Sequence, residues 1–150
     1  MAEGEEVTLM DWGNCFFRRI HRDASGRVTG IEGELHPSGD PKKTKLKLTW
    51  LADNEDKVKL RMIDYDYLIT KKKVEEEDDF VALVNRHSRK DTVAWGCGNL
   101  RTANKGDIFQ LERKGYFILD QVFVREGEET VIIAIPDGKQ RDVGIFAPKQ

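Results

Sequence analysis

Lys42-Lys43-Thr44-Lys45-Leu46-Lys47-Leu48-Thr49-Trp50 is the stretch that decides the fold. Side chains of a β-strand alternate between its two faces. On a strand here the core face comprises Thr44, Leu46, Leu48 and Trp50. The opposite face carries Lys43, Lys45 and Lys47, with ammonium groups about 7 Å apart. The stretch alone leaves two interpretations open: a solvated row of lysines that guards a sheet edge, or a positive ribbon that follows the phosphates of a nucleic acid.

Composition indicates a folded chain with an uneven charge. The 150 residues are 39% hydrophobic and 35% charged, with a net charge of -2, which fits one compact domain or two small ones. Residues 41–73 hold ten lysines and arginines against five carboxylates, which gives this segment a positive charge. The acidic residues Glu75–Asp79 follow and cancel that charge. A locally basic surface on an acidic whole is compatible with a nucleic-acid site.

The two cysteines, Cys15 and Cys97, are far apart and form no CxxC pair, which argues against a disulfide scaffold and a zinc site. Cys15 precedes two phenylalanines, so a buried core thiol is the expected role. A reducing, cytoplasmic location is expected. The sequence has no apolar run long enough for a membrane span and no signal peptide.

Short alternating segments predict a mainly β fold, a barrel or a sandwich, with one or two short helices. The expected strands cover residues 7–10, 15–21, 27–35, 42–50, 57–64 and 131–135, and the strongest hairpin joins 107–113 to 116–124 through a turn at Lys114-Gly115. Asp78 or Asp79 is expected to cap a short helix over residues 80–84. A subdomain boundary is expected where Lys71–Lys73 meet the acidic block.

Motifs of catalysis are missing from the sequence. It has no P-loop, GxGxxG, GxSxG or HExxH, and no acid–base pair stands out from its many carboxylates. We therefore expect a binding module with no catalytic residues and no metal site.

Five stretches together resemble the C-terminal anticodon-binding region of the class I synthetases for glutamate and glutamine. They are residues 4–14 (GEEVTLMDWGN), 42–52 (KKTKLKLTWLA), 65–73 (YDYLITKKK), 105–120 (KGDIFQLERKGYFILD) and 135–138 (IPDG). The likeness covers about residues 4–138. The spellings MDWGN, TWLA, YLITKK and IPDG resemble the eukaryotic-type glutamyl enzyme more than the glutaminyl one.

The resemblance implies two β-barrels of the ribosomal-protein-like anticodon-binding architecture, which hold the anticodon loop of glutamate tRNA between them. Residues 1–69 would form the distal barrel, and residues 70–150 the C-terminal part of the proximal barrel, whose opening strands would lie upstream of Met1. The HxGH-like and KMSKS-like signatures of class I catalysis are absent. The chain is therefore expected to be a fragment that binds no cofactor, whereas the parent enzyme would use ATP with magnesium and glutamate.

The resemblance also nominates readers of the anticodon bases. Gln110 and Arg113 match the segment where the glutaminyl enzyme places a Gln and an Arg against the anticodon, and both tRNAs share a middle U. A glutamine amide can donate to and accept from the Watson–Crick edge of uracil. The alternative is an ordinary strand, with Phe109 and Leu111 inward and Gln110 exposed; Arg113 breaks that alternation because its parity puts a charge on the apolar face.

A second set of readers is expected at the first anticodon base. The glutaminyl relatives carry arginines at the positions of Thr8 and Met10, and here those charges are gone. The candidates instead are Asp11, Trp12 and Asn14, since Trp12 offers a stacking face and Asn14 two-way hydrogen bonding. A core Trp12 that anchors a turn is the open alternative.

Phosphate contacts position RNA without reading its sequence. The residues expected to make them are Lys43, Lys45, Lys47, Lys71, Lys72 and Lys73. Two rival functions stay open: the same domain in a glutaminyl enzyme, and a protein-interaction module that docks the synthetase onto other synthetases or a scaffold protein.

Overall fold

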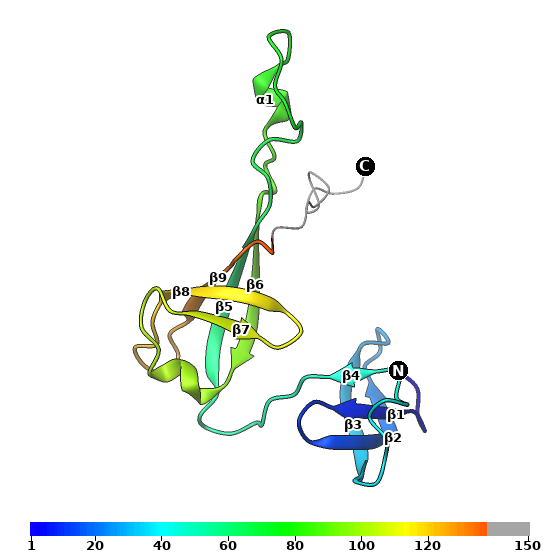
Figure 1. Ribbon diagram of the computed structural model, residues 1–150. Helices are drawn as coiled ribbons and strands as arrows, with labels where there is room; N and C mark the ends of the chain where they lie inside the picture. Colours follow the sequence, from blue (N-terminus) through cyan, green and yellow to red (C-terminus); the bar gives the residue numbers. More distant parts are fainter. Residues whose placement is uncertain (138–150) are drawn as a thin grey trace. The chain divides into compact units, whose positions relative to one another are not determined.

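The computed structural model describes residues 1–137, which divide into two compact units (Figure 1). The first unit is Met1–Trp50, and the second begins at Leu51. The mainly β prediction is confirmed. The boundary between the two compact units lies between Trp50 and Leu51, and not at the lysine–acid junction where a subdomain boundary was expected. The assignment of residues 1–69 and 70–150 to distal and proximal barrels stays a prediction.

The sheet of the first unit has the order β3-β2-β1-β4. Its strands are β1 (Glu6–Leu9), β2 (Gly13–Arg22), β3 (Val28–His36) and β4 (Lys47–Leu48). β2 and β3 form the predicted hairpin, whose turn holds Gly26 at φ 82°, a backbone conformation that suits glycine. Val7, Cys15 and Phe17 form the core of this unit, so the prediction of a buried Cys15 is confirmed.

The lysine stretch forms much less strand than its alternation predicts. Only Lys47–Leu48 are paired, parallel to Thr8–Leu9 of β1. Asp40 holds the start of the stretch in a turn, because its carbonyl accepts from the Lys43 amide and its carboxylate from the Lys42 amide. The core face is nevertheless confirmed for three of its four members, since Thr44 is buried and Leu46 and Leu48 pack against the core.

The sheet of the second unit has the order β6-β5-β9-β8-β7. Its strands are β5 (Val58–Tyr65), β6 (Arg89–Gly96), β7 (Ile108–Leu111), β8 (Gly115–Gln121) and β9 (Thr130–Ala134), and the 3-10 helix η1 spans Gly98–Arg101. β9 is central: it runs parallel to β5 and antiparallel to β8. The hairpin β7–β8 and the strand β9 match the predicted segments, whereas β6 falls where no strand was predicted.

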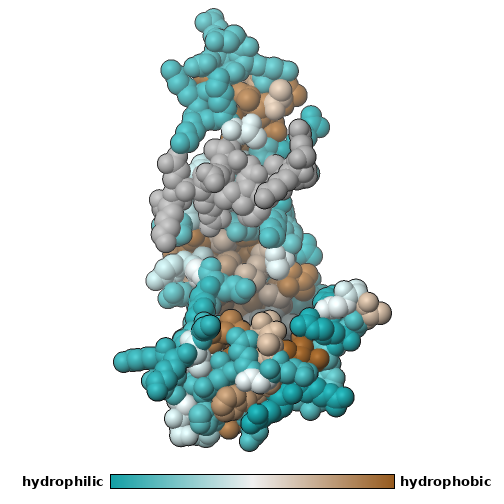
Figure 2. All heavy atoms as spheres, turned by 90° about the vertical axis from the view of Figure 1, so that its right-hand side faces the viewer, coloured by the Kyte–Doolittle hydropathy of each residue, from teal (hydrophilic) through white to brown (hydrophobic). Residues whose placement is uncertain are grey.

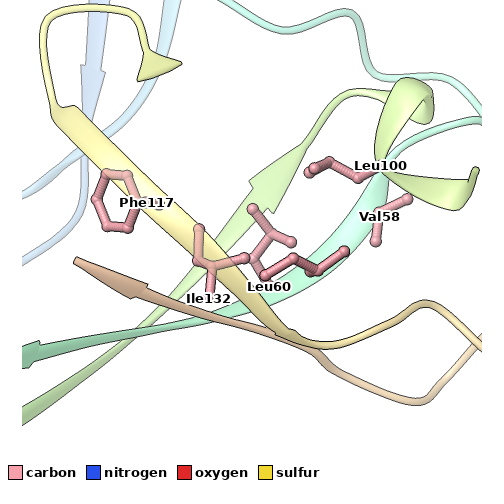
Figure 3. Packing of buried hydrophobic residues seen from close by; sticks show 6 residues of the cluster. Val58, Leu60, Leu100, Phe117 and Ile132 are labelled. Carbon is pink, nitrogen blue, oxygen red and sulfur yellow. The ribbon is translucent and has the colours of Figure 1, made fainter. Parts of the chain in front are cut away.

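One face of this sheet builds the larger core. Figure 3 shows Val58 and Leu60 of β5, Phe117 of β8 and Ile132 of β9 close together, with Leu100 of η1 beside them. Val58, Leu60 and Met62 of β5 contribute to this core, as their alternation predicts.

An extension of residues 66–88 joins β5 to β6 and projects beyond the ends of the strands (Figure 1). Near its tip lies α1 (Phe80–Leu83), and the Asp79 carboxylate accepts hydrogen bonds from the amides of Val81 and Ala82, which confirms the predicted cap. Figure 2 shows apolar side chains at the outer end of this extension, and the exposed ones include Leu68, Phe80 and Val81. No helix within residues 1–137 is long and apolar enough to cross a membrane.

Candidate nucleic-acid interface

The turn between β7 and β8 presents the first predicted readers. Gln110 is exposed on β7, while Phe109 and Leu111 pack against the core, so the predicted alternation is confirmed. The cross-strand neighbour of Gln110 is Tyr116 on β8, which is also exposed. Residues paired in this way lie side by side on one face of a sheet. Gln110 therefore stands beside an exposed aromatic ring, although sequence reasoning did not single out Tyr116.

Arg113 does not occupy the strand position that its parity predicts. β7 ends at Leu111, and the amide of Lys114 donates to the Leu111 carbonyl at 2.9 Å. Arg113 lies inside this turn with φ 60° and is exposed. The argument that it places a charge on the apolar face was wrong because the turn begins earlier than the sequence indicates. As an exposed guanidinium at a hairpin tip, Arg113 remains available for RNA.

The turn between β1 and β2 repeats this geometry in the other unit. The amide of Trp12 donates to the Leu9 carbonyl at 3.1 Å, and Asp11 has φ 57° at the position that corresponds to Arg113. Within residues 1–137, Asp11 and Arg113 are the non-glycine residues with positive φ. Such a conformation is strained for a residue with a side chain. Asp11 and Arg113, one from each predicted group of readers, thus occupy the same position in two hairpin turns of the same kind.

Trp12 is an exposed residue and not a core anchor. Its side chain is 55% exposed, and its ring centroid lies 4.7 Å from that of Trp50. Asp11 beside it is exposed as well. Trp50, which the alternation placed on the core face, is 48% exposed. The structure therefore favours the accessible Trp12 over the alternative of a buried one.

Asn14 must be removed from the candidate readers. It is 1% exposed, its amide oxygen accepts from the Thr8 hydroxyl at 2.9 Å, and its amide nitrogen donates to Glu6 at 2.8 Å. A Cβ atom built on Gly39 would collide with both Asn14 and Glu6, so the loop after β3 covers this face. The prediction was wrong because the side chain serves a buried polar network.

Acid should weaken this network through Glu6. Hydrogen bonds with Asn14 and with His36 lower the pKa of the Glu6 carboxyl below its usual 4.5. A carboxyl with a depressed folded-state pKa contributes stability above its unfolded pKa and loses it as the pH falls through the folded value. We expect Glu6→Gln to lower the melting temperature at pH 7. Below about pH 4 the melting temperature of the variant should fall less steeply with decreasing pH than that of the parent chain.

The measurement is thermal unfolding of both chains across that pH range. Glu34→Gln is the control, since Glu34 is exposed and its pair with Arg18 lies on the surface; surface pairs contribute little to stability. An equal loss of melting temperature at pH 7 for Glu6→Gln and Glu34→Gln would contradict the network's role.

The lysines near β4 do not form one ribbon. Lys43 and Lys45 are exposed, but Lys47 is half-buried and its ammonium turns back onto the carbonyl of Pro41 and onto Thr44. An ammonium that satisfies backbone carbonyls in this way holds the 41–44 turn. The prediction that Lys47 contacts phosphate is therefore replaced by a structural role, and Lys43 and Lys45 remain candidates.

The lysines of the extension divide in the same manner. The ammonium of Lys71 lies 2.7 Å from the Asp78 carboxylate and 3.1 Å from Glu75. Hydrogen bonds to Asp78 and then Glu75 raise the pKa of Lys71, and the bond from Lys71 lowers the pKa of Asp78. Lys71 is thus neutralised within the extension. Lys72 and Lys73 are exposed and remain candidates.

A hollow of about 640 Å³ on the second unit has internal ion pairs in its wall. It is lined by Lys59, Arg61 and Glu129 among others. Glu129 lies 3.1 Å from Lys59 and accepts from Arg61 at 2.7 Å. The residues that the structure describes contain no group of three His, Cys, Asp or Glu side chains able to hold a metal ion.

Comparison with known proteins places the chain in a family. Residues 47–120 match the family model described as "tRNA synthetases class I (E and Q), anti-codon binding domain". The chain belongs to this family. The matched span includes Gln110, Arg113 and Lys71–Lys73, and the β1–β2 turn with Asp11 and Trp12 precedes it.

Similar full-length relatives cover most of this chain. "Glutamate--tRNA ligase, cytoplasmic" of Arabidopsis thaliana is 50% identical over 139 residues, which is 93% of this chain and 19% of the relative. "Probable glutamate--tRNA ligase, cytoplasmic" of Schizosaccharomyces pombe is 48% identical over 137 residues, 91% of this chain and 19% of the relative. "Bifunctional glutamate/proline--tRNA ligase" of Mus musculus is 32% identical over 158 residues, 99% of this chain and 10% of the relative. The chain thus spans a fifth or less of these relatives.

Proposed function

We propose that this anticodon-binding chain binds the anticodon loop of glutamate tRNA as part of a cytoplasmic glutamate–tRNA ligase. The observation that carries the proposal is the alignment, since relatives of that name match the chain along nine-tenths of its length. The family description covers glutamate and glutamine alike. The names of these relatives favour glutamate, which leaves the glutaminyl enzyme as the weaker alternative.

The geometry supports a loop binder that combines two kinds of contact. Exposed residues at the two similar turns offer hydrogen bonding and stacking to unpaired bases: Gln110, Arg113, Tyr116, Asp11 and Trp12. Sequence-specific RNA recognition mostly uses bases of this kind, splayed out of a helix. The exposed lysines supply charge without sequence information. They are Lys43, Lys45, Lys72 and Lys73.

The direct test is titration of the chain with glutamate tRNA and with a tRNA of unrelated anticodon, at several salt concentrations. We expect tighter binding of the glutamate tRNA and a steep loss of affinity with salt, since phosphate contacts release counterions. Equal affinity for both tRNAs would reject anticodon recognition. Salt-insensitive binding would reject the phosphate contacts.

The lysines provide a prediction with internal controls. Lys43→Gln with Lys45→Gln, or Lys72→Gln with Lys73→Gln, should weaken all tRNAs equally and flatten the slope of log affinity against log salt. Each lost phosphate contact should reduce that slope by somewhat under one unit. The neighbouring variants Lys47→Gln and Lys71→Gln should leave the slope unchanged, because both ammonium groups bond within the chain. An unchanged slope in the double variants would mean that those lysines are only solvated.

Catalysis is proposed to reside elsewhere in the parent protein. We propose that the parent uses ATP with magnesium and glutamate, and that this chain binds none of them. The isolated chain should therefore show no ATP–pyrophosphate exchange with glutamate. The assay needs a preparation free of host synthetase, and exchange above the buffer blank would contradict the prediction.

A protein contact is the second candidate function, and the extension favours it. Its exposed apolar side chains, including Leu68, Phe80 and Val81, lie near the acidic run Glu75–Asp79, which would repel phosphate. The proposed partner is another synthetase or a scaffold protein. Binding of such a partner that survives high salt and is lost in Phe80→Ser with Val81→Ser would support this function; retention in that variant would reject it.

A further inference from the structure

Trp50 is fixed to the β1–β2 turn by its own indole. The Nε1–H of Trp50 donates to the carbonyl of Met10 at 2.8 Å. The amide of Met10 donates in turn to the Leu48 carbonyl at 2.9 Å. Both backbone polar groups of Met10 thus bond to the segment that ends in Trp50. The turn and the segment after β4 are held together at this point.

The same contact places the rings of Trp50 and Trp12 against each other. Their centroids are 4.7 Å apart and their planes meet at 45°, a separation typical of interacting aromatic pairs. Trp12 follows Asp11, whose left-handed conformation sets the direction of the chain at the tip. Packing against Trp50 therefore restricts the orientations open to the Trp12 ring.

This pair keeps large apolar surfaces in solvent. Burial of a tryptophan ring is strongly favourable, because each aromatic side chain can remove 150–250 Å² from water. Here about half of each side chain stays exposed, 55% for Trp12 and 48% for Trp50. Two adjacent, oriented rings at a hairpin tip match the way in which single-stranded nucleic acids are held, by bases stacked on aromatic faces.

We infer that Trp50 is a positioning residue, and that it orients Trp12 as a platform on which one unpaired base of the bound RNA stacks. The inference rests on the proposed function and adds to it a residue outside the predicted readers. Asp11, next to the platform, offers an acceptor-only carboxylate to the amino or imino groups of that base. The exposed Lys43 and Lys45 precede Trp50 in the same segment and supply positive charge.

The test measures binding of an RNA hairpin with the glutamate anticodon loop to five chains: the parent, Trp12→Ala, Trp50→Ala, Trp50→Phe and the double alanine variant. Trp12→Ala should weaken binding roughly tenfold or more, the usual loss for a base–aromatic stack. Trp50→Ala should weaken it by less. In the double variant Trp50→Ala should add almost nothing, since a positioning residue acts only through the ring that it orients.

Two further variants separate positioning from a general loss of structure. Trp50→Phe keeps an aromatic ring but loses the donor to Met10, so its affinity should lie between those of the parent and Trp50→Ala. Trp95→Ala in β6 removes a tryptophan with the same exposed fraction, 55%, and should bind as the parent does. Melting temperatures accompany each measurement, and comparisons are made between chains folded at the assay temperature.

The outcomes distinguish the inference from the proposed function. If the parent chain binds the hairpin, and both Trp12→Ala and Trp50→Ala bind it as tightly as the parent does, the platform is rejected while the proposed function stands. If Trp50→Ala weakens binding by the same factor with and without Trp12, positioning is rejected. If the parent chain binds no tRNA and no hairpin, the proposed function fails and the platform fails with it.

Discussion

Ile132→Ala is expected to lower the free energy of unfolding by about 2–5 kcal/mol. Ile132 is 0% exposed and lies in β9 between Met62 of β5 and Leu119 of β8. The substitution removes buried apolar atoms and leaves a cavity. The cavity cannot collapse easily, because β9 is paired with a strand on each side. The loss should be large because Ile132 lies at the centre of the sheet of the second unit.

Chemical unfolding of the parent and variant chains measures this effect. Ile108→Ala in β7 is the matched control, since Ile108 is 64% exposed and surface substitutions change stability by about 0.5 kcal/mol or less. Similar losses for the two variants would contradict the central position of Ile132. A changed slope with denaturant would indicate an altered compactness of the unfolded or native state, or a loss of two-state unfolding, and not a simple cavity.

The second large effect is expected for RNA recognition at Gln110. If its amide reads the middle anticodon base, Gln110→Ala should weaken binding of a U-bearing loop by about 1–3 kcal/mol, by analogy with bidentate base contacts in DNA. With another base at that position the loss should be much smaller, because the contact is already absent. Gln110 is exposed, so the folded state should tolerate the change.

A double-mutant cycle of Gln110 against the anticodon base isolates this contact. Gln121→Ala, which removes another exposed glutamine at the end of β8, is the control. Arg113 is best replaced by glycine, since glycine accepts its φ of 60° without strain; this variant should lose affinity without losing stability. A coupling energy near zero at unchanged melting temperature would show that Gln110 does not read the base.

Local signals in the sequence predicted the elements that local chemistry builds. The cap at Asp79, the turn at Gly26 and the alternation through Gln110 each depend on residues within one short segment, and all three are present. β6 escaped prediction because its residues are mostly exposed. Pairing with β5 along its whole length defines it, and that partner lies across the extension.

Two errors at the candidate interface, at Lys47 and Asn14, come from side-chain contacts that the sequence pattern does not show. By sequence Lys47 resembles its exposed neighbours, but in the structure its ammonium donates to carbonyls of the 41–44 turn. Asn14 follows a turn in the sequence, but in the structure its side chain is buried and bonds to Thr8 and Glu6. Tyr116 could have been found, because the hairpin turn sets the register that pairs it with Gln110. Trp50 could not, because its partner Met10 is remote in the sequence.

The parallel pairing of β5 with β9 joins segments far apart in the sequence, which favours folding of the first unit before the second. The strands of the first unit all lie within residues 6–48, so its sheet can form as soon as that segment leaves the ribosome. The second sheet joins Leu60 to Thr130, and closing so long a loop costs entropy before any contact compensates for it. Until β9 is synthesised, the strand that joins β5 to β8 in the second sheet is missing. During synthesis, the Trp12 turn can therefore reach its final form before β9 is available to the sheet that contains Gln110.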